Sequence, residues 1–239
     1  MRALFISDLH LSEDRPEANE RFFGFLEDTA AGADALYVLG DLFEYWIGDD
    51  DVDTPFNAVI AGFFRRLTAG GTRLYVMHGN RDFLMGDRFC AATGAGLLPD
   101  PWVGELDGEK TLLMHGDTLC TDDLDYQNWR RIARSEKWQR EFLAKPLDER
   151  RTAVHGLRDK SKEVIQAKAA EIMDVNDAAV RDALRRSGAT RLIHGHTHRV
   201  GRHKVDVDGR ACERWVLPDW YGAGGYLELS GRKPRLVRW

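Results

Sequence analysis

Five short motifs in this 239-residue chain place carboxylate, amide or imidazole groups directly after apolar runs that are typical of buried strands. The motifs are Asp8-x-His10, Gly40-Asp41, Gly79-Asn80-Arg81-Asp82, His115-Gly116-Asp117 and Gly195-His196-Thr197-His198. Oxygen donors mixed with imidazoles, with no cysteine in any motif, suit Mn²⁺ or a similar divalent ion. The residue types therefore predict a metal centre, and their number predicts two ions.

The spacing within the motifs supports this interpretation. Asp8 and His10 alternate on a strand end, so both side chains face the same side. Asp41 has two carboxylate oxygens and can bridge two ions. His196 and His198 have the same spacing on a turn, so each can serve a different ion. The expected metal ligands are Asp8, His10, Asp41, Asn80, His115, His196 and His198.

Strands and helices that alternate along the chain must bring these motifs together. The apolar runs before the motifs are residues 3–7, 35–39, 74–77, 111–114 and 191–193. In an open α/β sheet, the carboxyl ends of the strands share the edge where ligands bind. We expect one helix over residues 19–31 and another that begins at Thr54-Pro55 and ends at Gly70-Gly71. This alternation favours an α/β sandwich, followed by three β-like segments after Arg214.

The segment over residues 122–174 differs from its surroundings because it is predicted to be helical throughout. Residues 126–168 contain 12 Lys or Arg against 6 Asp or Glu, a local charge of +6. Its basic residues include Arg130, Arg131 and Arg134, and apolar residues are interleaved with them. Such helices can lie on an anionic membrane or bind an amphiphile. The alternative is an ordinary helical subdomain with a solvated basic face.

Composition excludes several classes of protein. A hydrophobic fraction of 43% is ample for a core, and no run reaches the roughly 18 apolar residues that span a bilayer. The net charge of −5 gives no reason to expect nucleic acid as a partner. A cleaved signal peptide would remove Asp8 and His10, and three widely spaced cysteines suit a reducing compartment. We therefore expect a cytoplasmic protein. Separately, we expect it to be a monomer.

The order of the motifs resembles that of the calcineurin-like metallophosphoesterases, and the similarity covers most of the chain. Longer matching strings are similar to the UDP-2,3-diacylglucosamine hydrolase family of lipid A biosynthesis. These strings are Ile6–Leu11, Leu39–Glu44, Trp46–Asp50, His78–Leu84, Met114–Asp123, Ile172–Asn176 and Ile193–Arg199. Strings of this length are far more specific than the metal motifs alone.

The resemblance implies a four-layer αββα sandwich in a single domain over residues 1–239. The helical insertion at about 122–174 is then a cap over the active site. Two Mn²⁺ ions are implied per chain. The first ion would be bound by Asp8, His10, Asp41 and His198, and the second by Asp41, Asn80, His115 and His196.

The implied reaction is hydrolysis of UDP-2,3-diacylglucosamine to UMP and 2,3-diacylglucosamine 1-phosphate (lipid X). A metal-bridging hydroxide would attack the α-phosphorus. The expected catalytic residues are Asp41, Asn80, Arg81 and His196. Many phosphomonoesterases of the superfamily carry a proton-donating histidine where this chain has Arg81. Because a phosphate leaving group needs less protonation, arginine at this position fits a pyrophosphatase, and its planar fork can pair with phosphate oxygens.

The resemblance also implies where the substrate binds. The expected contacts are Asn80, Arg81, Asp123, Arg158, Ser161, Ile165, Lys168 and His196, and Ile165 replaces a polar residue of some relatives. Candidates for the walls of an acyl-chain chamber, or for packing between the cap helices, are Trp129, Trp138, Phe142, Leu143 and Leu147. The basic amphipathic insertion would rest on the cytoplasmic face of the inner membrane. Another phosphodiesterase or a nuclease on the same fold is the alternative.

Several other acidic residues are given no role as metal ligands. We expect Asp82 and Asp117 to orient the ligands rather than bind metal. Glu44 and the acidic run at residues 49–51 are expected to form a solvated loop, although Glu44 could support Asp41.

Overall fold

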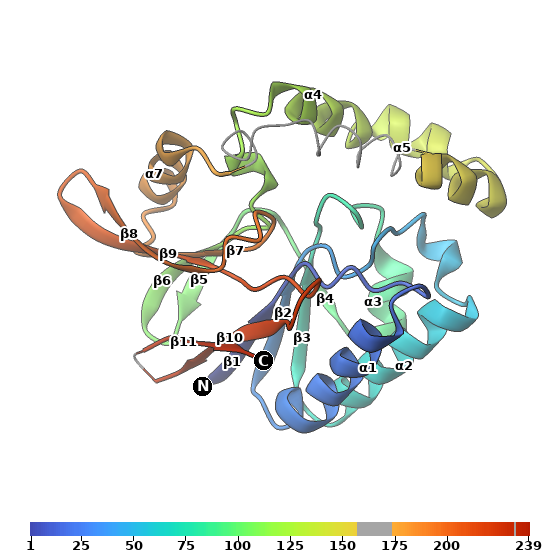
Figure 1. Ribbon diagram of the computed structural model, residues 1–239, viewed down its shortest axis with the longest axis horizontal. Coiled ribbons are helices and arrows are strands. Elements are labelled where there is room, and N and C mark those ends of the chain that lie inside the picture. Colours follow the sequence, from blue (N-terminus) through green and yellow to red (C-terminus); the bar gives the residue numbers. More distant parts are fainter. Residues whose placement is uncertain (157–173, 232) are drawn as a thin grey trace.

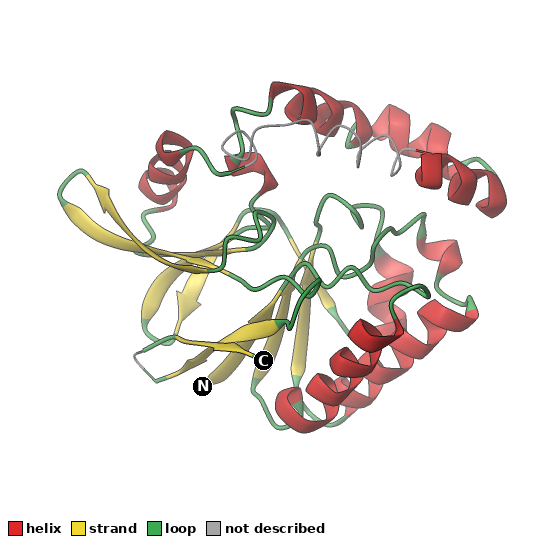
Figure 2. Ribbon diagram, in the orientation of Figure 1, coloured by secondary structure: helices red, strands yellow, loops and turns green. Residues whose placement is uncertain are grey.

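Two β-sheets form the centre of the computed structural model, which describes residues 1–156, 174–231 and 233–239 (Figure 2). One sheet has the strand order β11-β10-β1-β2-β3-β4, and the other has the order β5-β6-β7-β9-β8. The first comprises β1 (Arg2–Ile6), β2 (Ala35–Leu39), β3 (Arg73–Met77), β4 (Gly96–Leu98), β10 (Gly225–Ser230) and β11 (Arg235–Arg238). The second comprises β5 (Trp102–Leu106), β6 (Glu109–Leu113), β7 (Arg191–His194), β8 (Gly201–Val207) and β9 (Arg210–Val216).

The central strands are buried on both faces, which explains their continuous apolar runs. In β1, Leu4 and Ile6 belong to the core under the helices, whereas Ala3 and Phe5 belong to the core between the sheets. Strands β1, β2 and β3 are parallel neighbours, and so are β6 and β7. Their carboxyl ends, which carry the five motifs, therefore lie along shared edges.

A layer of helices covers the outer face of the six-stranded sheet (Figure 1). It contains α1 (Pro16–Gly24), a π-helical turn η1 (Phe25–Ala30), α2 (Pro55–Ala69) and α3 (Asp87–Thr93). The predicted start of α2 at Thr54-Pro55 and its end at Gly70 are confirmed. The helix expected over residues 19–31 begins earlier, at Pro16, and changes to π-helical geometry in its second half.

Helix α7 (Asp177–Ser187) covers the outer face of the five-stranded sheet and completes the fourth layer. Asn176 caps it by accepting hydrogen bonds from the main-chain N–H groups of Ala178 and Ala179. Val180 and Leu184 of this helix pack against the sheet. The predicted αββα sandwich is therefore confirmed.

Helices α4 (Leu124–Ala133) and α5 (Glu136–Leu143) extend across the end of the molecule at which β1, β2 and β3 terminate (Figure 1). Asp123 and Ser135 cap the two helices with side-chain oxygens, and residues 147–156 continue in helical form. The described part of the expected insertion is thus helical, as predicted. Among the described residues, no helix is both long and apolar enough to cross a membrane.

Candidate metal centre

The candidate ligands follow strands of both sheets and meet at one end of the sandwich, where loops from the two stacked sheets come together. From the six-stranded sheet, Asp8 and His10 follow β1, Asp41 follows β2 and Asn80 follows β3. From the five-stranded sheet, His115 follows β6, and His196 and His198 follow β7. Each side chain therefore starts from the carboxyl end of a buried strand, as the sequence predicts.

The backbone at the site is unusual. In the described part of the chain, seven residues other than glycine have positive φ, and five of them are candidate ligands. These five are Asp8, His10, Asp41, His196 and His198, with φ between 51° and 67°. Left-handed conformations of this kind cost on the order of 1–3 kcal/mol each and cluster at functional sites.

Two glycines allow the loops to approach each other closely. A Cβ on Gly79 would lie closer than 3.0 Å to the main-chain nitrogen and Oδ1 of Asp41. A Cβ on Gly195 would lie equally close to Oγ of Ser7 and Oδ2 of Asp8. Real Cβ atoms do not approach other atoms this closely, so both motifs require glycine at these positions.

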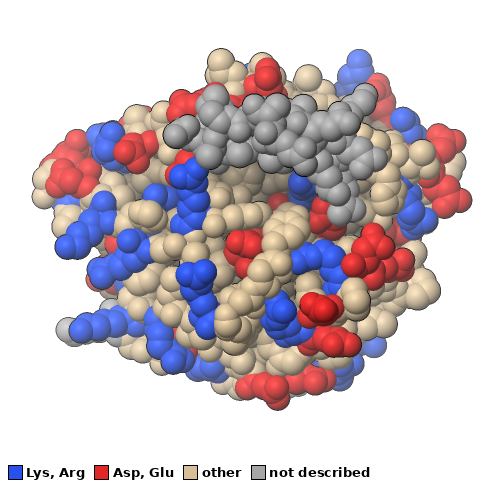
Figure 3. Space-filling view, in the orientation of Figure 1, with Lys and Arg blue, Asp and Glu red and all other residues tan. Residues whose placement is uncertain are grey.

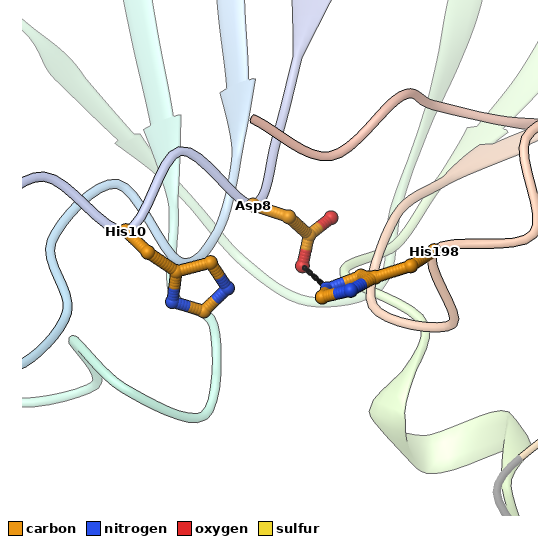
Figure 4. Close-up of side chains that lie close together, drawn as sticks. All are labelled: Asp8, His10 and His198. Carbon is orange, nitrogen blue, oxygen red and sulfur yellow. Dashed lines mark ion pairs between the residues drawn. The ribbon is translucent and has the colours of Figure 1, made fainter. Parts of the chain in front are cut away.

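Asp8, His10 and His198 form one cluster (Figure 4). Oδ1 of Asp8 lies 3.5 Å from Nε2 of His198. Its Oδ2 accepts hydrogen bonds from the Ser7 hydroxyl and, at 2.9 Å, from the main-chain N–H of His196. Oδ1 of Asp8 and both ring nitrogens of His10 are buried and have no hydrogen-bond partner. A divalent cation would satisfy Oδ1 of Asp8 and Nε2 of His10, so the residues of this cluster fit a metal ion.

Asn80, His115 and His196 form a second convergence. The amide oxygen of Asn80 lies 3.0 Å from Nε2 of His115 and 3.0 Å from Nδ1 of His196. Nδ1 of His115 donates a hydrogen bond of 2.9 Å to the carbonyl oxygen of Leu39. This bond orients the ring and leaves Nε2 to face the centre, as is usual for histidines that bind metal.

Asp41 lies between the two clusters. Its Oδ2 is 3.7 Å from Nε2 of His10, and its Oδ1 is 3.8 Å from Nε2 of His115. Oδ1 also accepts a hydrogen bond of 2.9 Å from the main-chain N–H of Arg81. The two oxygens of one carboxylate thus face histidines of different clusters.

Charge at the site favours cations. Burial disfavours a charged imidazole at His115, but the carboxylates of Asp41, Asp8 and Asp117 outweigh it and raise the pKa of His115 to about 9. A metal ion that binds there must displace this proton. Burial, together with the charge of His115, lowers the pKa of His196 to about 4 and keeps that ring neutral.

Asp82 and Asp117 hold loops in place, as predicted. Asp82 accepts hydrogen bonds from the main-chain N–H groups of Gly79 (2.8 Å) and Leu42 (2.7 Å), which joins the second and third motifs. Asp117 accepts from the Tyr126 hydroxyl at 2.6 Å and from Nε of Arg130 at 2.7 Å. Helix α4 is thereby fixed to the fourth motif.

The expectation that Glu44 and the acidic run at 49–51 form a solvated loop is wrong for Glu44 and Asp51, which are buried, whereas Asp50 is exposed. Glu44 is buried, with Oε2 3.3 Å from Nδ1 of His10, so it supports His10 rather than Asp41. Asp49 accepts hydrogen bonds from the main-chain N–H groups of Gly86 and Arg88. Carboxylates are accommodated here because donors satisfy them: the Tyr221 hydroxyl donates to Glu44, and main-chain N–H groups donate to Asp49.

Two of the three arginines singled out in the basic insertion make contacts with the loops of the candidate centre. Arg130 binds Asp117, and a guanidinium nitrogen of Arg134 donates a hydrogen bond of 2.8 Å to the carbonyl oxygen of Gly79. Arg131 is exposed. The sequence does not separate these cases because the three arginines lie within five residues of one another at the end of α4.

The candidate substrate contacts are only partly described. Asp123 caps α4, accepting a hydrogen bond from the main-chain N–H of Tyr126. Arg158, Ser161, Ile165 and Lys168 lie outside the described residues. Trp138 stacks on Phe142 with 4.8 Å between ring centroids, and its ring lies 6.0 Å from that of Phe83 beside the third motif.

The chain belongs to the calcineurin-like phosphoesterase family, whose pattern matches residues 1–200. Curated relatives are similar over nearly the full length. A UDP-2,3-diacylglucosamine hydrolase of Aromatoleum aromaticum is 50% identical over 98% of this chain and 95% of its own. Hydrolases of the same name from Aliivibrio fischeri and Pseudomonas paraeruginosa are 47% and 48% identical, over 97% and 98% of this chain and 96% and 98% of their own.

Proposed function

We propose that this protein is an enzyme that hydrolyses UDP-2,3-diacylglucosamine to UMP and 2,3-diacylglucosamine 1-phosphate at a centre of two metal ions. The observation that carries the proposal is the position of Asp41, whose two oxygens face His10 and His115. Its support from comparison is the full-length similarity to hydrolases of that name.

The proposed ligands of the first ion are Asp8, His10, Asp41 and His198, and those of the second are Asp41, Asn80, His115 and His196. Buried Asp8 Oδ1 and His10 Nε2, both without hydrogen-bond partners, support the first set. The approach of His115 and His196 to the Asn80 oxygen supports the second. Mixed imidazole and oxygen donors favour two Mn²⁺ ions per chain.

When bound, two such ions would supply a more acidic water for attack on the α-phosphorus and positive charge opposite the phosphate oxygens. The chain holds the reacting groups. Asp41 and Asn80 fix positions between the two clusters, and neutral His196 keeps a lone pair available. The bond from Arg81 N–H to Asp41 holds Arg81 beside the ligands, where its guanidinium can bind developing charge on the phosphate oxygens.

We further propose that residues 1–239 form one domain in which the insertion at about 122–174 caps the centre. The bonds from Tyr126 and Arg130 to Asp117, and from Arg134 to Gly79, support this position. The substrate would contact Asn80, Arg81, Asp123 and His196, together with Arg158, Ser161, Ile165 and Lys168. The rings of Trp129, Trp138 and Phe142, with Leu143 and Leu147, would line the acyl chains.

A peripheral position on the cytoplasmic face of the inner membrane, as a monomer, completes the proposal. Leu124 and Ile132 of α4 are 70% and 54% exposed, and Arg131 is exposed beside them. Apolar groups next to a cation are suited to an anionic membrane surface. Acidic and basic side chains are interspersed over the described part of the face in Figure 3, which favours this substrate over an extended nucleic-acid strand.

Product analysis tests the proposal. The Mn²⁺-loaded protein is incubated with UDP-2,3-diacylglucosamine in ¹⁸O-labelled water, and the products are followed by ³¹P NMR. We expect UMP and the sugar 1-phosphate, with the label on UMP. Hydrolysis of DNA instead of this substrate would indicate a nuclease. Absence of turnover in protein that holds two Mn²⁺ ions would contradict the proposed substrate.

A further inference from the structure

We propose that Tyr221 and Glu44 together orient His10 and thereby set the metal affinity of one of the two ion sites. This inference rests on the proposed metal centre. Tyr221 lies beyond the residues that match the family pattern, which end at residue 200. It is a positioning residue, since the structure places it against ligands rather than against substrate.

The first contact is a chain of polar groups. The Tyr221 hydroxyl donates a hydrogen bond of 3.1 Å to Oε2 of Glu44, and the same oxygen lies 3.3 Å from Nδ1 of His10. A carboxylate beside Nδ1 favours the tautomer that carries its proton there. Nε2 of His10, which lies 3.7 Å from Asp41 Oδ2, then keeps its lone pair for a metal ion.

The second contact is ring packing. The Tyr221 ring stacks on His10 with 4.7 Å between centroids and an angle of 27° between planes. It also lies 5.7 Å from the ring of His198. Tyr221 therefore touches both imidazoles of the cluster that includes Asp8. Half of its own surface is exposed, so it separates these rings from solvent on that side.

Arg15 holds Tyr221 in this position. Its guanidinium carbon lies 4.5 Å from the centre of the Tyr221 ring, a cation–π distance. One guanidinium nitrogen donates to the carbonyl oxygens of Leu9 and His10 at 2.8 and 2.9 Å, and another donates to that of Trp220 at 2.7 Å. One side chain thus joins the loop of the first motif to a loop 205 residues later.

The second ion site is built differently. His115 is oriented by the main-chain carbonyl of Leu39, and both groups are buried. Within the described residues, His115 contacts His196 and Asn80, whereas Tyr221 contacts His10, His198 and Glu44. A change at Tyr221 should therefore weaken the site of His10 and leave the site of His115 intact.

Mn²⁺ titration of the metal-free protein tests this difference. Wild type, Tyr221→Phe, Tyr221→Ala and Glu44→Gln are titrated by calorimetry, and the spin-coupled Mn²⁺ pair is followed by electron paramagnetic resonance. Tyr75→Phe is the matched control, because Tyr75 lies within β3 and stacks on Tyr37 between the sheets. Circular dichroism establishes that every variant is folded.

We expect two ions in wild type and in Tyr75→Phe. In Tyr221→Ala one of the two affinities should fall about 10- to 100-fold, the usual effect of removing a group that orients a ligand. At low Mn²⁺ concentration, the electron paramagnetic resonance spectrum of this variant should then show a single bound ion instead of the spin-coupled pair. Tyr221→Phe keeps the ring and loses the hydroxyl, so its defect should be smaller and should resemble that of Glu44→Gln.

Folded Tyr221→Ala and Glu44→Gln proteins with both wild-type affinities would overturn this inference and leave the proposed function standing. Equal weakening of both ions would also overturn it, because the effect would not be specific to His10. Failure of wild type to bind two ions would instead overturn the proposed centre, and this inference with it.

Discussion

The amide oxygen of Asn80 lies 3.0 Å from Nε2 of His115, although 35 residues separate them and each follows a strand of a different sheet. The candidate centre is therefore built across the junction of the two sheets. Its geometry depends on the core between them, which includes Phe5, Leu39 and Leu113.

Asp41→Ala should be the most damaging single change among the ligands. It removes both oxygens that face His10 and His115, so both ions lose a ligand. We expect turnover to fall well over 100-fold, since even residues that only orient ligands contribute about 10- to 100-fold. Turnover and Mn²⁺ content per chain are measured together. A variant that retains two ions and near-normal turnover would refute the bridging role.

Gly79→Ala should displace Asp41 because the added Cβ meets main-chain atoms that cannot move aside. We expect a loss of about 1–3 kcal/mol in unfolding free energy, typical of overpacking, and a fall in Mn²⁺ content. Gly24→Ala is the matched control, since Gly24 lies in α1 with open space at its Cβ position. It should leave activity unchanged and stability equal or up to about 1 kcal/mol higher. Similar behaviour of the two variants would contradict the argument.

Arg81→Lys should separate phosphate binding from metal binding. The hydrogen bond to Asp41 comes from the main chain of Arg81, so the substitution leaves it in place. Lysine cannot reproduce the two-pronged contact of a guanidinium with phosphate. We expect kcat/KM to fall about 100-fold while two Mn²⁺ ions remain bound. Loss of metal in this variant would show that Arg81 acts on the ligands instead.

Glu228 provides a test of pH dependence away from the centre. The hydrogen bond from Arg235 outweighs burial and, with Arg2, holds the pKa of Glu228 below its usual value near 4.3. A lowered pKa in the folded state means that the stabilisation is complete above about pH 4.3 and is lost as pH falls further.

Glu228→Gln should thus reduce the free energy of unfolding by about 0.5–1 kcal/mol at neutral pH, since both arginines are partly exposed. The difference from wild type should shrink toward pH 3. Urea denaturation at about pH 7 and pH 3 measures this difference in the free energy of unfolding. An equal difference at both pH values would show that the ion pairs are not its source.

Membrane binding should depend on the outer side of α4. Leu124→Ser combined with Ile132→Ser removes two exposed apolar side chains, and Arg131→Glu reverses the exposed charge. We expect several-fold weaker sedimentation with vesicles that contain anionic phospholipid. Val59→Ser is the control, because Val59 is 50% exposed on α2 outside the insertion. Unchanged sedimentation of the α4 variants would exclude this surface as the membrane contact.

Much of the fold could be predicted because strong local patterns determine it. The β2 strand has the predicted bounds, and Thr54-Pro55 begins α2 as expected. Strands β4, β5 and β8 were not predicted, since β4 has only three residues and the other two are largely exposed. Without a continuous apolar run, these strands depend on pairing with their neighbours, which one sequence does not reveal.

The candidate ligands could be found because each one follows a buried strand and most are next to glycine. The residues that orient these ligands could not be found from the sequence. Glu44 and Tyr221 reach His10 from loops distant in sequence, and Arg15 reaches its carbonyl oxygen from five residues further along the chain. Nothing local distinguishes these three from solvated residues. Charged and aromatic side chains of these kinds are common on the surface of any protein. Only the tertiary arrangement assigns them a role.

Five candidate ligands adopt a backbone conformation that lowers the stability of the fold, because their φ angles are positive. They are Asp8, His10, Asp41, His196 and His198. Glycine adopts such a backbone without strain, so at His198, whose side chain accepts no main-chain hydrogen bond in the described structure, replacement by glycine can relieve strain while it removes a ligand. The other two positive-φ residues, Asp107 and Asp208, each precede a glycine in a hairpin turn. Activity is therefore retained at this part of the chain against a backbone conformation that a purely structural role would not need.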